Sequence, residues 1–155
     1  MNKYFLSGSI ALVVVITDQI TKSIIKANIP LYKSIPVVDG FFNITHVKNT
    51  GGAFGILSDM NSLFFIIASS IALLIVIIYL IRLPENNLWL ITSLSLISGG
   101  AIGNMIDRVR SGEVIDFIDL FYDRFHWPAF NIADSSITVG VFILLINLLT
   151  FRKEK

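Results

Sequence analysis

Residues 60–81 read MNSLFFIIASSIALLIVIIYLI, a run of 22 residues without a single charge. A helix of about 20 predominantly apolar residues is long enough to cross the roughly 30 Å hydrocarbon core of a bilayer. The run also lacks the strict alternation that marks the strands of membrane barrels. Because only helices and closed barrels satisfy every backbone group in lipid, we predict that residues 60–81 form a transmembrane helix.

Three further apolar stretches of similar length surround this run, at 4–25, 86–106 and 135–151. The composition agrees with a membrane protein, since 54% of the residues are apolar, 15% are charged and the mean hydropathy is +0.77. A soluble domain carries about 25% charged residues. The sequence therefore predicts an all-α integral membrane protein in which four transmembrane helices form a single domain over residues 1–155.

Charge and cysteine content exclude several classes of function. The net charge of +1 gives no strong attraction to nucleic acid, and the absence of cysteine removes disulfides and thiolate chemistry. Lys3 before the apolar run 4–25 is typical of a secretory signal. No small-residue cleavage site follows that run, so we expect a retained helix.

The distribution of positive charge predicts the orientation of the four helices, whose even number puts both termini on one side. The basic residues on that side lie in very short segments, namely Lys3, Arg82, Arg152, Lys153 and Lys155. Those at or beyond the other side are more numerous but spread over two longer segments, namely Lys22, Lys26, Lys33, Lys48, Arg108, Arg110 and Arg124. Because short flanking loops weigh most, we predict cytoplasmic termini and outer segments at 27–59 and 107–134.

The outer segments carry most of the unusual residues. Residues 35–48 alternate in the manner of a small strand or hairpin lying on the membrane surface. Residues 49–55, NTGGAFG, hold three glycines and fit either a close backbone approach or an ordinary loop re-entering the membrane. The aromatic residues between 121 and 130 are typical of an anchor at the lipid headgroups. No partner for His126 is visible in the sequence, and we do not expect it to bind a metal.

Two polar groups lie within the predicted helices. Asp18 and Lys22 are four residues apart and share one face, about 20 Å along the first helix. They fit either a salt bridge with each other or pairing with another helix, for instance Asp18 with Arg108. In the third helix, Ser95, Gly99 and Gly103 form a small-residue stripe that favours close helix packing. A neighbouring face at its outer end carries Gly100, Asn104, Asp107 and Arg108.

Two further carboxylates lie at the same predicted membrane face. Taken singly, Asp116 is interpreted as a loop acid within a mostly apolar run, and Asp134 as the N-cap of the last helix. Paired aspartates can share one proton, because like charges at close range push their two pKa values apart. One can then activate a water while the other donates to a substrate carbonyl. The residues alone do not show that the two carboxylates meet.

Five sequence blocks carry a resemblance to a known family. They are DQITK at 18–22, NTGGAF at 49–54, GAIGNMIDR at 100–108, GEVIDF at 112–117 and FNIADS at 130–135. In this order, and in a chain of this length, they resemble signal peptidase II, the lipoprotein signal peptidase of bacteria. Each block alone is a weak signal, whereas the five together are highly specific.

The resemblance implies an aspartic endopeptidase that removes the signal peptide of a prolipoprotein by cutting just before a cysteine that carries diacylglyceryl. It implies a catalytic dyad of Asp116 and Asp134, with no metal and no other cofactor. Residues at the motif positions that shape or support the site are Asp18, Lys22, Asn49, Gly51, Gly100, Asn104, Asp107, Arg108, Val114, Phe130, Asn131 and Ala133.

The resemblance also implies a setting and partners. A small extracytoplasmic β-cradle and a surface helix would come from residues 27–59. The chain would lie in the bacterial inner (cytoplasmic) membrane, with its active site near the extracytoplasmic face. The expected partners are diacylglyceryl-modified prolipoproteins, membrane lipid and globomycin-type inhibitors. We expect a monomer that does not bind nucleic acid.

Two other classes of function fit part of the sequence. A small proton- or ion-conducting membrane protein could use Asp18, Asp107, Asp116 and Asp134 as a carboxylate relay. A relay should place its acids through the membrane depth, yet the interiors of three predicted helices are uncharged. A non-catalytic scaffold would have no use for so large a polar cluster.

Overall fold

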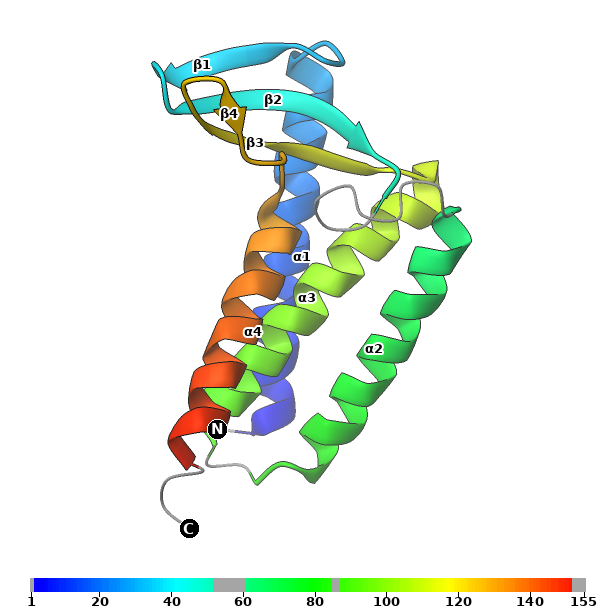
Figure 1. Ribbon diagram of the computed structural model, residues 1–155. Helices are drawn as coiled ribbons and strands as arrows, with labels where there is room; N and C mark the ends of the chain where they lie inside the picture. Colours follow the sequence, from blue (N-terminus) through cyan, green and yellow to red (C-terminus); the bar gives the residue numbers. More distant parts are fainter. Residues whose placement is uncertain (1, 52–60, 85–86, 152–155) are drawn as a thin grey trace.

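The computed structural model describes residues 2–51, 61–84 and 87–151, and the structural statements below concern these residues. Four helices are long and apolar enough to cross a membrane. They are α1 (Lys3–Asn28), α2 (Ser62–Arg82), α3 (Leu88–Ser111) and α4 (Ile132–Phe151). They run alternately up and down, and both chain ends lie at the same end of the bundle (Figure 1). The predicted four-helix membrane fold is confirmed.

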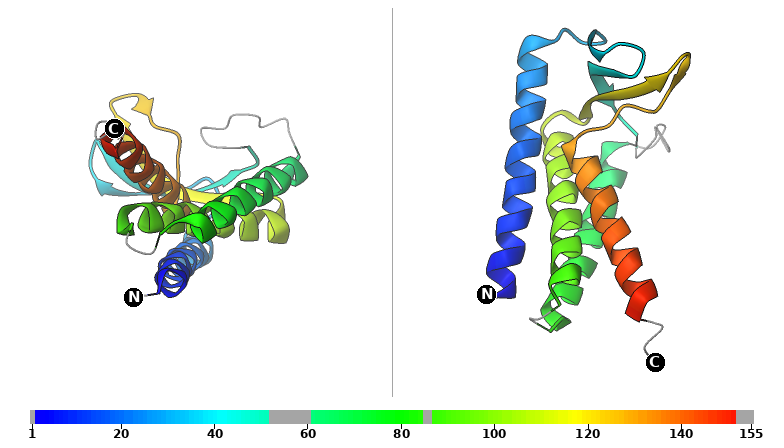
Figure 2. Two further views of the ribbon diagram at one scale, coloured as in Figure 1. Left: turned by 90° about the horizontal axis from the view of Figure 1, so that it is seen from below. Right: turned by 90° about the vertical axis from the view of Figure 1, so that its left-hand side faces the viewer.

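Helix α3 is the centre of the bundle and contacts each of the other three helices (Figures 1 and 2). The predicted stripe of small residues explains its close approach to α1. A Cβ atom added to Gly99 would lie 2.8 Å from Cβ of Val14, and Ser95 donates a hydrogen bond to Ser7 at 2.8 Å. Gly100 on the neighbouring face is equally tight against α4, because an added Cβ would overlap the carbonyl oxygen of Ala133. These contacts position the first turn of α4 against α3.

The end of the bundle that holds the termini is closed by a buried cation. Lys3 at the start of α1 donates hydrogen bonds to the carbonyl oxygens of Ile81 at 2.9 Å and Leu83 at 2.6 Å. These carbonyls lie at the C-terminal end of α2, where a helix leaves acceptors unsatisfied and favours positive charge. Helix α2 has no buried residue of its own. Its apolar side chains therefore face the surroundings, as a lipid-exposed helix requires.

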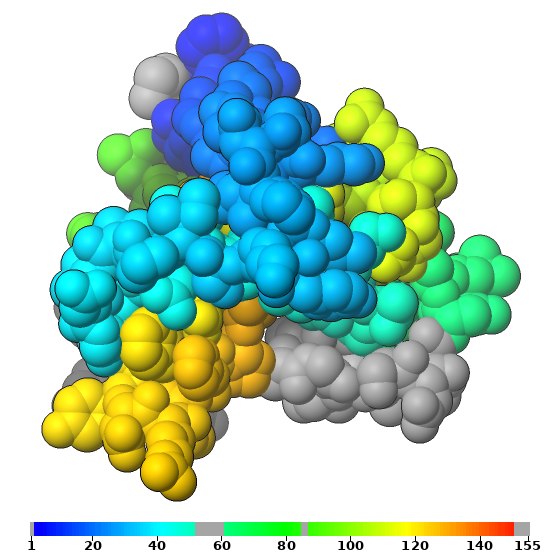
Figure 3. Space-filling view, turned by 90° about the horizontal axis from the view of Figure 1, so that it is seen from above, coloured from blue at the N-terminus to red at the C-terminus, as the bar shows by residue number. Residues whose placement is uncertain are grey.

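A four-stranded antiparallel sheet covers the opposite end of the bundle, in the order β1-β2-β3-β4 (Figures 1 and 3). The strands are β1 (Ser34–Val38), β2 (Phe42–Asn49), β3 (Val114–Tyr122) and β4 (Phe125–His126). The hairpin predicted within 35–48 is confirmed. Residues 29–51 form strands and turns, so the surface helix expected from 27–59 would have to fall within 52–59, which lie outside the described residues.

Strand β3 corrects the interpretation of Asp116 as a loop acid. The run from Val114 to Tyr122 pairs with β2, and Asp116 stands opposite Val47. The partner strand lies about seventy residues earlier in the chain, so no local pattern reveals the pairing. The consequence for the site is direct, because a paired strand holds Asp116 far more firmly than a loop would.

Candidate active site

Asp134 lies in the first turn of α4, where a reciprocal pair of hydrogen bonds fixes it. The side-chain oxygen of Asn131 accepts the backbone N–H of Asp134 at 2.9 Å, and the Asp134 carboxylate accepts the backbone N–H of Asn131 at 3.2 Å. This is the capping-box arrangement, in which two unpaired donors of a helix start are satisfied together. The prediction that Asp134 is itself the N-cap was therefore wrong. The helix begins at Ile132, and Asn131 caps it by accepting the Asp134 N–H.

Asp116 reaches the same place from β3 and is 2% exposed. Each of its carboxylate oxygens accepts a hydrogen bond from a side-chain amide. Asn131 donates to Oδ1 at 2.6 Å, and Asn49 at the end of β2 donates to Oδ2 at 2.9 Å. Asn131 therefore contacts Asp116 through its side chain and Asp134 through its backbone. A single residue brings together the two predicted carboxylates.

The environment of Asp116 makes it hard to ionise. Burial raises the pKa of its carboxyl to about 7, and the negative charge of Asp134 contributes in the same direction. The hydrogen bonds from Asn49 and Asn131 oppose this rise, because both favour the carboxylate form. A carboxyl with a pKa near neutrality can both hold and release a proton under physiological conditions.

A buried ion cluster supports the other side of the pair. Asn104 donates to Asp134 at 2.7 Å and accepts from the Lys22 ammonium at 2.9 Å. The same ammonium lies 2.8 Å from a carboxylate oxygen of Asp18 and 2.8 Å from one of Asp107. Lys22 therefore donates a hydrogen bond to Asn104 and has two carboxylates within ion-pair distance, so its buried charge is compensated. The predicted salt bridge between Asp18 and Lys22 is confirmed, and Asp107 extends it.

Asp18 also joins α1 directly to the start of α4. Its second oxygen accepts the backbone N–H of Ala133 at 3.0 Å, one of the donors that a helix start leaves unpaired. The suggested pairing of Asp18 with Arg108 is wrong. Arg108 instead donates to the carbonyl oxygen of Gly51 at 2.8 Å, and its guanidinium lies 4.8 Å from the centre of the Phe65 ring.

All the residues that the five motif blocks assigned to the site gather at this end of the bundle. Those joined to the two carboxylates or to one another by hydrogen bonds or ion pairs are Asp18, Lys22, Asn49, Asn104, Asp107, Asn131 and Ala133. Gly51 is held by Arg108, Gly100 packs on Ala133, and Val114 and Phe130 line the two cavities described next.

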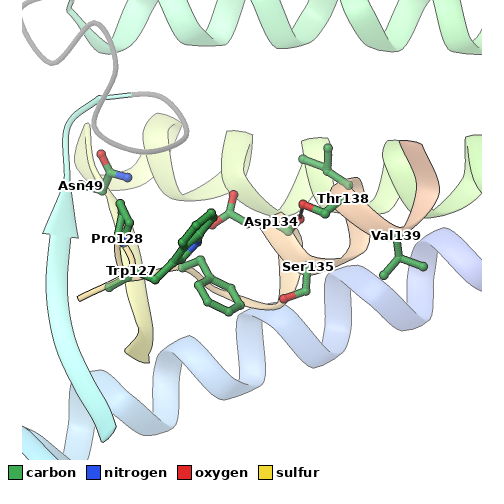
Figure 4. A pocket seen from close by; sticks show the side chains of 10 residues that line it. Asn49, Trp127, Pro128, Asp134, Ser135, Thr138 and Val139 are labelled. Carbon is green, nitrogen blue, oxygen red and sulfur yellow. Dashed lines mark hydrogen bonds between the residues drawn. The ribbon is translucent and has the colours of Figure 1, made fainter. Parts of the chain in front are cut away.

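Two cavities meet at Asp134. The first, of about 420 Å³, is walled by residues 127–130 and by the start of α4 (Figure 4). The second, of about 310 Å³, lies among α2, α3 and α4 and reaches Arg108 and Val114. Asn49, Asp134 and Ile137 line both. The remaining lining is mostly apolar, so the Asp134 carboxylate faces spaces suited to hydrocarbon.

The prediction from the sequence did not include two residues of this site, Gln19 and Trp127. Gln19 stands within the 18–22 block, and its amide donates to Asp107 at 2.9 Å and to the carbonyl oxygen of Gly103 at 3.2 Å. The position of Gln19 inside this motif could have identified it as a residue of the site. Trp127, which the sequence treated only as a membrane anchor, forms a wall of the first cavity. Its neighbours Pro128 and Asn49 lie beside it (Figure 4).

His126 has partners, contrary to the sequence interpretation. Its Nδ1 atom lies 2.8 Å from Oδ1 of Asp119, and its ring stacks on Phe121 with centres 4.8 Å apart. Asn43 donates to the other oxygen of Asp119 at 3.0 Å. These contacts tie β4 to β2 and β3, and β4 leads directly into Trp127. Among the described residues, no group of three or more histidine, aspartate and glutamate side chains is arranged to hold a metal ion.

Comparison with known proteins adds independent information. Residues 10–150 match the family model described as signal peptidase (SPase) II. The lipoprotein signal peptidase of Staphylococcus aureus (strain MRSA252) is 46% identical, over 99% of this chain and 97% of that one. The lipoprotein signal peptidase of Syntrophus aciditrophicus (strain SB) is 44% identical, over 92% and 91%. A solved structure described as a bacterial membrane enzyme is 43% identical and superposes with a TM-score of 0.91, over 100% of this chain and 96% of that one.

Proposed function

This chain belongs to the signal peptidase II family, and we propose that it removes the signal peptide from diacylglyceryl-modified prolipoproteins by cleaving just before the lipidated cysteine. We propose Asp116 and Asp134 as the catalytic dyad of this aspartic endopeptidase. The observation that carries the assignment is the position of Asn131. It donates its side-chain amide to one carboxylate and its backbone N–H to the other.

The proposed chemistry needs one proton shared by the pair. The ionised carboxylate takes a proton from a water molecule, whose oxygen attacks the scissile carbonyl carbon. The protonated partner donates its proton to the carbonyl oxygen, giving a neutral tetrahedral intermediate. Collapse of that intermediate breaks the C–N bond, and the amine leaves with a proton returned through the dyad. The raised pKa of Asp116 keeps a proton available near neutral pH.

The surroundings of the dyad suit a lipidated substrate. Two mostly apolar cavities flank Asp134, and the sheet lies above them at one end of the membrane-spanning helices. A diacylglyceryl group can therefore remain among apolar side chains while the peptide bond reaches the carboxylates. We place the termini in the cytoplasm and the dyad near the extracytoplasmic face of the bacterial inner membrane. The short basic segments beside the termini support that orientation.

The proposal extends to the partners of this site. Membrane lipid surrounds the four helices, and globomycin-type cyclic peptides inhibit by occupying the cavities beside the dyad. The helices and sheet of one chain supply both carboxylates and their supporting residues, so a monomer is sufficient for activity. The four acids of a conducting relay are gathered at one end of the bundle around Lys22 and Asn131, which disfavours a path through the membrane.

Conservative substitutions test the dyad. We expect Asp116→Asn and Asp134→Asn each to abolish cleavage of a diacylglyceryl-modified precursor in detergent, while thermal unfolding shows folded protein. Asp123→Asn is the matched control, because Asp123 is exposed in the turn between β3 and β4 and asparagine accepts its positive φ of 54°. Normal cleavage by either dyad variant would refute the assignment. Failure of the unmodified protein to cleave any lipidated precursor would refute the function itself.

A further inference from the structure

A third cavity lies far from the dyad, at the end of the bundle that holds the termini. It has a volume of about 370 Å³ and is lined by Trp89 at the start of α3 and by Ile143, Ile146, Asn147 and Thr150 of α4. We call it the inner cavity. Helix α3 begins and α4 ends at this level, on the side of the bundle away from the sheet (Figure 1). No step of the proposed peptide-bond cleavage uses this space.

Asn147 is the unusual residue of the inner cavity. Its side chain is 7% exposed, yet it makes no hydrogen bond to any other described residue. An amide in apolar surroundings is costly unless it is hydrogen-bonded, and polar residues inside transmembrane helices generally serve a function. The nearby Thr150 hydroxyl already donates to the carbonyl oxygen of Ile146 at 2.8 Å. The amide of Asn147 therefore remains available to a molecule that enters the cavity.

One face of α4 links the inner cavity to the dyad. Ser135 and Val139 line the first cavity beside Asp134, while Ile143 and Ile146 line the inner one. Residues four apart lie on the same face of a helix, so this face continues from one cavity to the other. From Asp134 to Asn147 the helix rises by about 20 Å, at 1.5 Å per residue.

That distance matches the length of the apolar segment of a signal peptide. A secretory signal has a positively charged n-region followed by an apolar segment of about 7–15 residues. As a helix the apolar segment spans about 10–22 Å. With the scissile bond at the dyad, the start of that segment and its basic residues reach the level of Asn147.

The inner cavity carries side chains that can bind the N-terminal end of the signal-peptide helix and its basic residues. The first turn of the signal-peptide helix has unpaired N–H donors, which the side-chain oxygen of Asn147 can accept. Trp89 is 68% exposed, and the face of an indole ring attracts lysine and arginine side chains. We propose that the inner cavity binds the basic n-region of the signal peptide through Asn147 and Trp89, with the face of α4 setting the distance to the dyad. This inference rests on the proposed function and its orientation.

Paired substrates test the inference. One substrate is a full-length precursor with two lysines in its n-region, the second replaces these lysines by glutamine, and the third is a short diacylglyceryl peptide that lacks the n-region and apolar segment. We expect Asn147→Leu and Trp89→Leu each to lower kcat/KM for the lysine precursor about tenfold, mainly by raising KM. Cleavage of the short peptide should be unchanged. Leu149→Ala, at an exposed position of the same helix, is the control and should behave as the unmodified protein.

Each outcome bears on a different claim. If the unmodified protein cleaves none of the three substrates, the proposed function fails. If it cleaves them but the Asn147 and Trp89 variants match it on the lysine precursor, the n-region site is refuted. Equal loss on the long and short substrates would show a structural defect and also refute it. A loss that is the same for lysine and glutamine precursors, and that added phospholipid modulates, would identify lipid as the occupant and overturn the proposal.

Discussion

The side-chain nitrogen of Asn131 lies 2.6 Å from Oδ1 of Asp116, and the same asparagine caps the helix that carries Asp134. The fold thereby makes one residue responsible for the geometry of both carboxylates. A change in the first turn of α4 is transmitted to the strand that bears Asp116, and the reverse holds as well.

Substitution of Asn131 separates its two roles. Asn131→Asp keeps an acceptor for the Asp134 N–H but loses the amide donor and puts a third acid beside Asp116. We expect an intact helix cap and a fall in kcat of about 100-fold, the scale seen when an oriented donor is lost from an active site. Asn131→Leu loses both roles and should also lower the free energy of unfolding, by about 1 kcal/mol for the cap alone. Full activity in Asn131→Asp would contradict the positioning role.

The raised pKa of Asp116 predicts a pH dependence. Because the mechanism needs one proton on the pair, kcat/KM should fall as pH rises above about 7, by about tenfold per pH unit. Asn49 stabilises the ionised form through its hydrogen bond, so Asn49→Leu should raise the pKa further and move the alkaline limb to higher pH. A pH–rate profile of both proteins measures the shift. An alkaline limb that stays in place, or moves to lower pH, would contradict the prediction.

The same pKa has a consequence for stability. The folded value of about 7 lies above the ordinary value of 3.8, so the folded state binds this proton more tightly than the unfolded chain does. Ionisation of Asp116 therefore costs stability progressively as pH rises from about 4 to above 7. Asp116→Asn removes this cost and should unfold at a higher temperature than the unmodified protein at pH 8, with the difference vanishing near pH 4. If the difference in unfolding temperature between Asp116→Asn and the unmodified protein did not depend on pH, this explanation would be excluded.

The cation at the centre of the buried cluster predicts a large loss of stability. Lys22→Met leaves Asp18 and Asp107 buried without their counter-charge, which costs about 3–5 kcal/mol. The triple variant with Asp18→Asn and Asp107→Asn removes those charges as well and should recover much of that loss. Thermal unfolding in detergent compares the proteins. If Lys22→Met were as stable as the unmodified protein, the cluster would not have the structural role described.

The close contact between α3 and α4 predicts sensitivity at one glycine. Gly100→Ala places a methyl group against the Ala133 carbonyl and should cost about 1–3 kcal/mol. It also pushes Asp134 away from Asn104, so activity should fall more than stability alone explains. Gly8→Ala is the matched control, since nothing lies within 4 Å of its added Cβ and alanine favours a helix interior by about 0.5–1 kcal/mol. Equal behaviour of the two variants would contradict this packing argument.

Hydropathy predicted the membrane helices well, because their apolar composition is a local property of each stretch. The salt bridge between Asp18 and Lys22 could also be predicted, since four-residue spacing determines a shared helix face. Strand β3 could not be predicted in this way. Its pairing with β2 depends on residues far apart in the chain, and neither strand alone determines which segment it meets.

The sequence predicted which residues form most of the site, but it predicted few of the contacts among them. The family motifs pointed to Asp116, Asp134 and their neighbours, but they gave no partner for each side chain. Arg108 shows the limit, because its charge suggested an acid partner whereas it donates to the backbone carbonyl of Gly51. Every residue has a backbone carbonyl, so the residue types cannot identify which carbonyl accepts the hydrogen bond. Only the three-dimensional structure shows it.

The two proposed catalytic acids belong to different layers of the molecule. Asp116 is carried by the sheet that lies over the bundle, and Asp134 by the first turn of a helix that can span the bilayer. A peptide bond reaches both only at the boundary between those layers. The position of the scissile bond along the membrane normal then determines where cleavage occurs, and the side chains around the bond matter less. Precursors with little sequence in common can share such an enzyme, provided that an acyl anchor holds each at the right height.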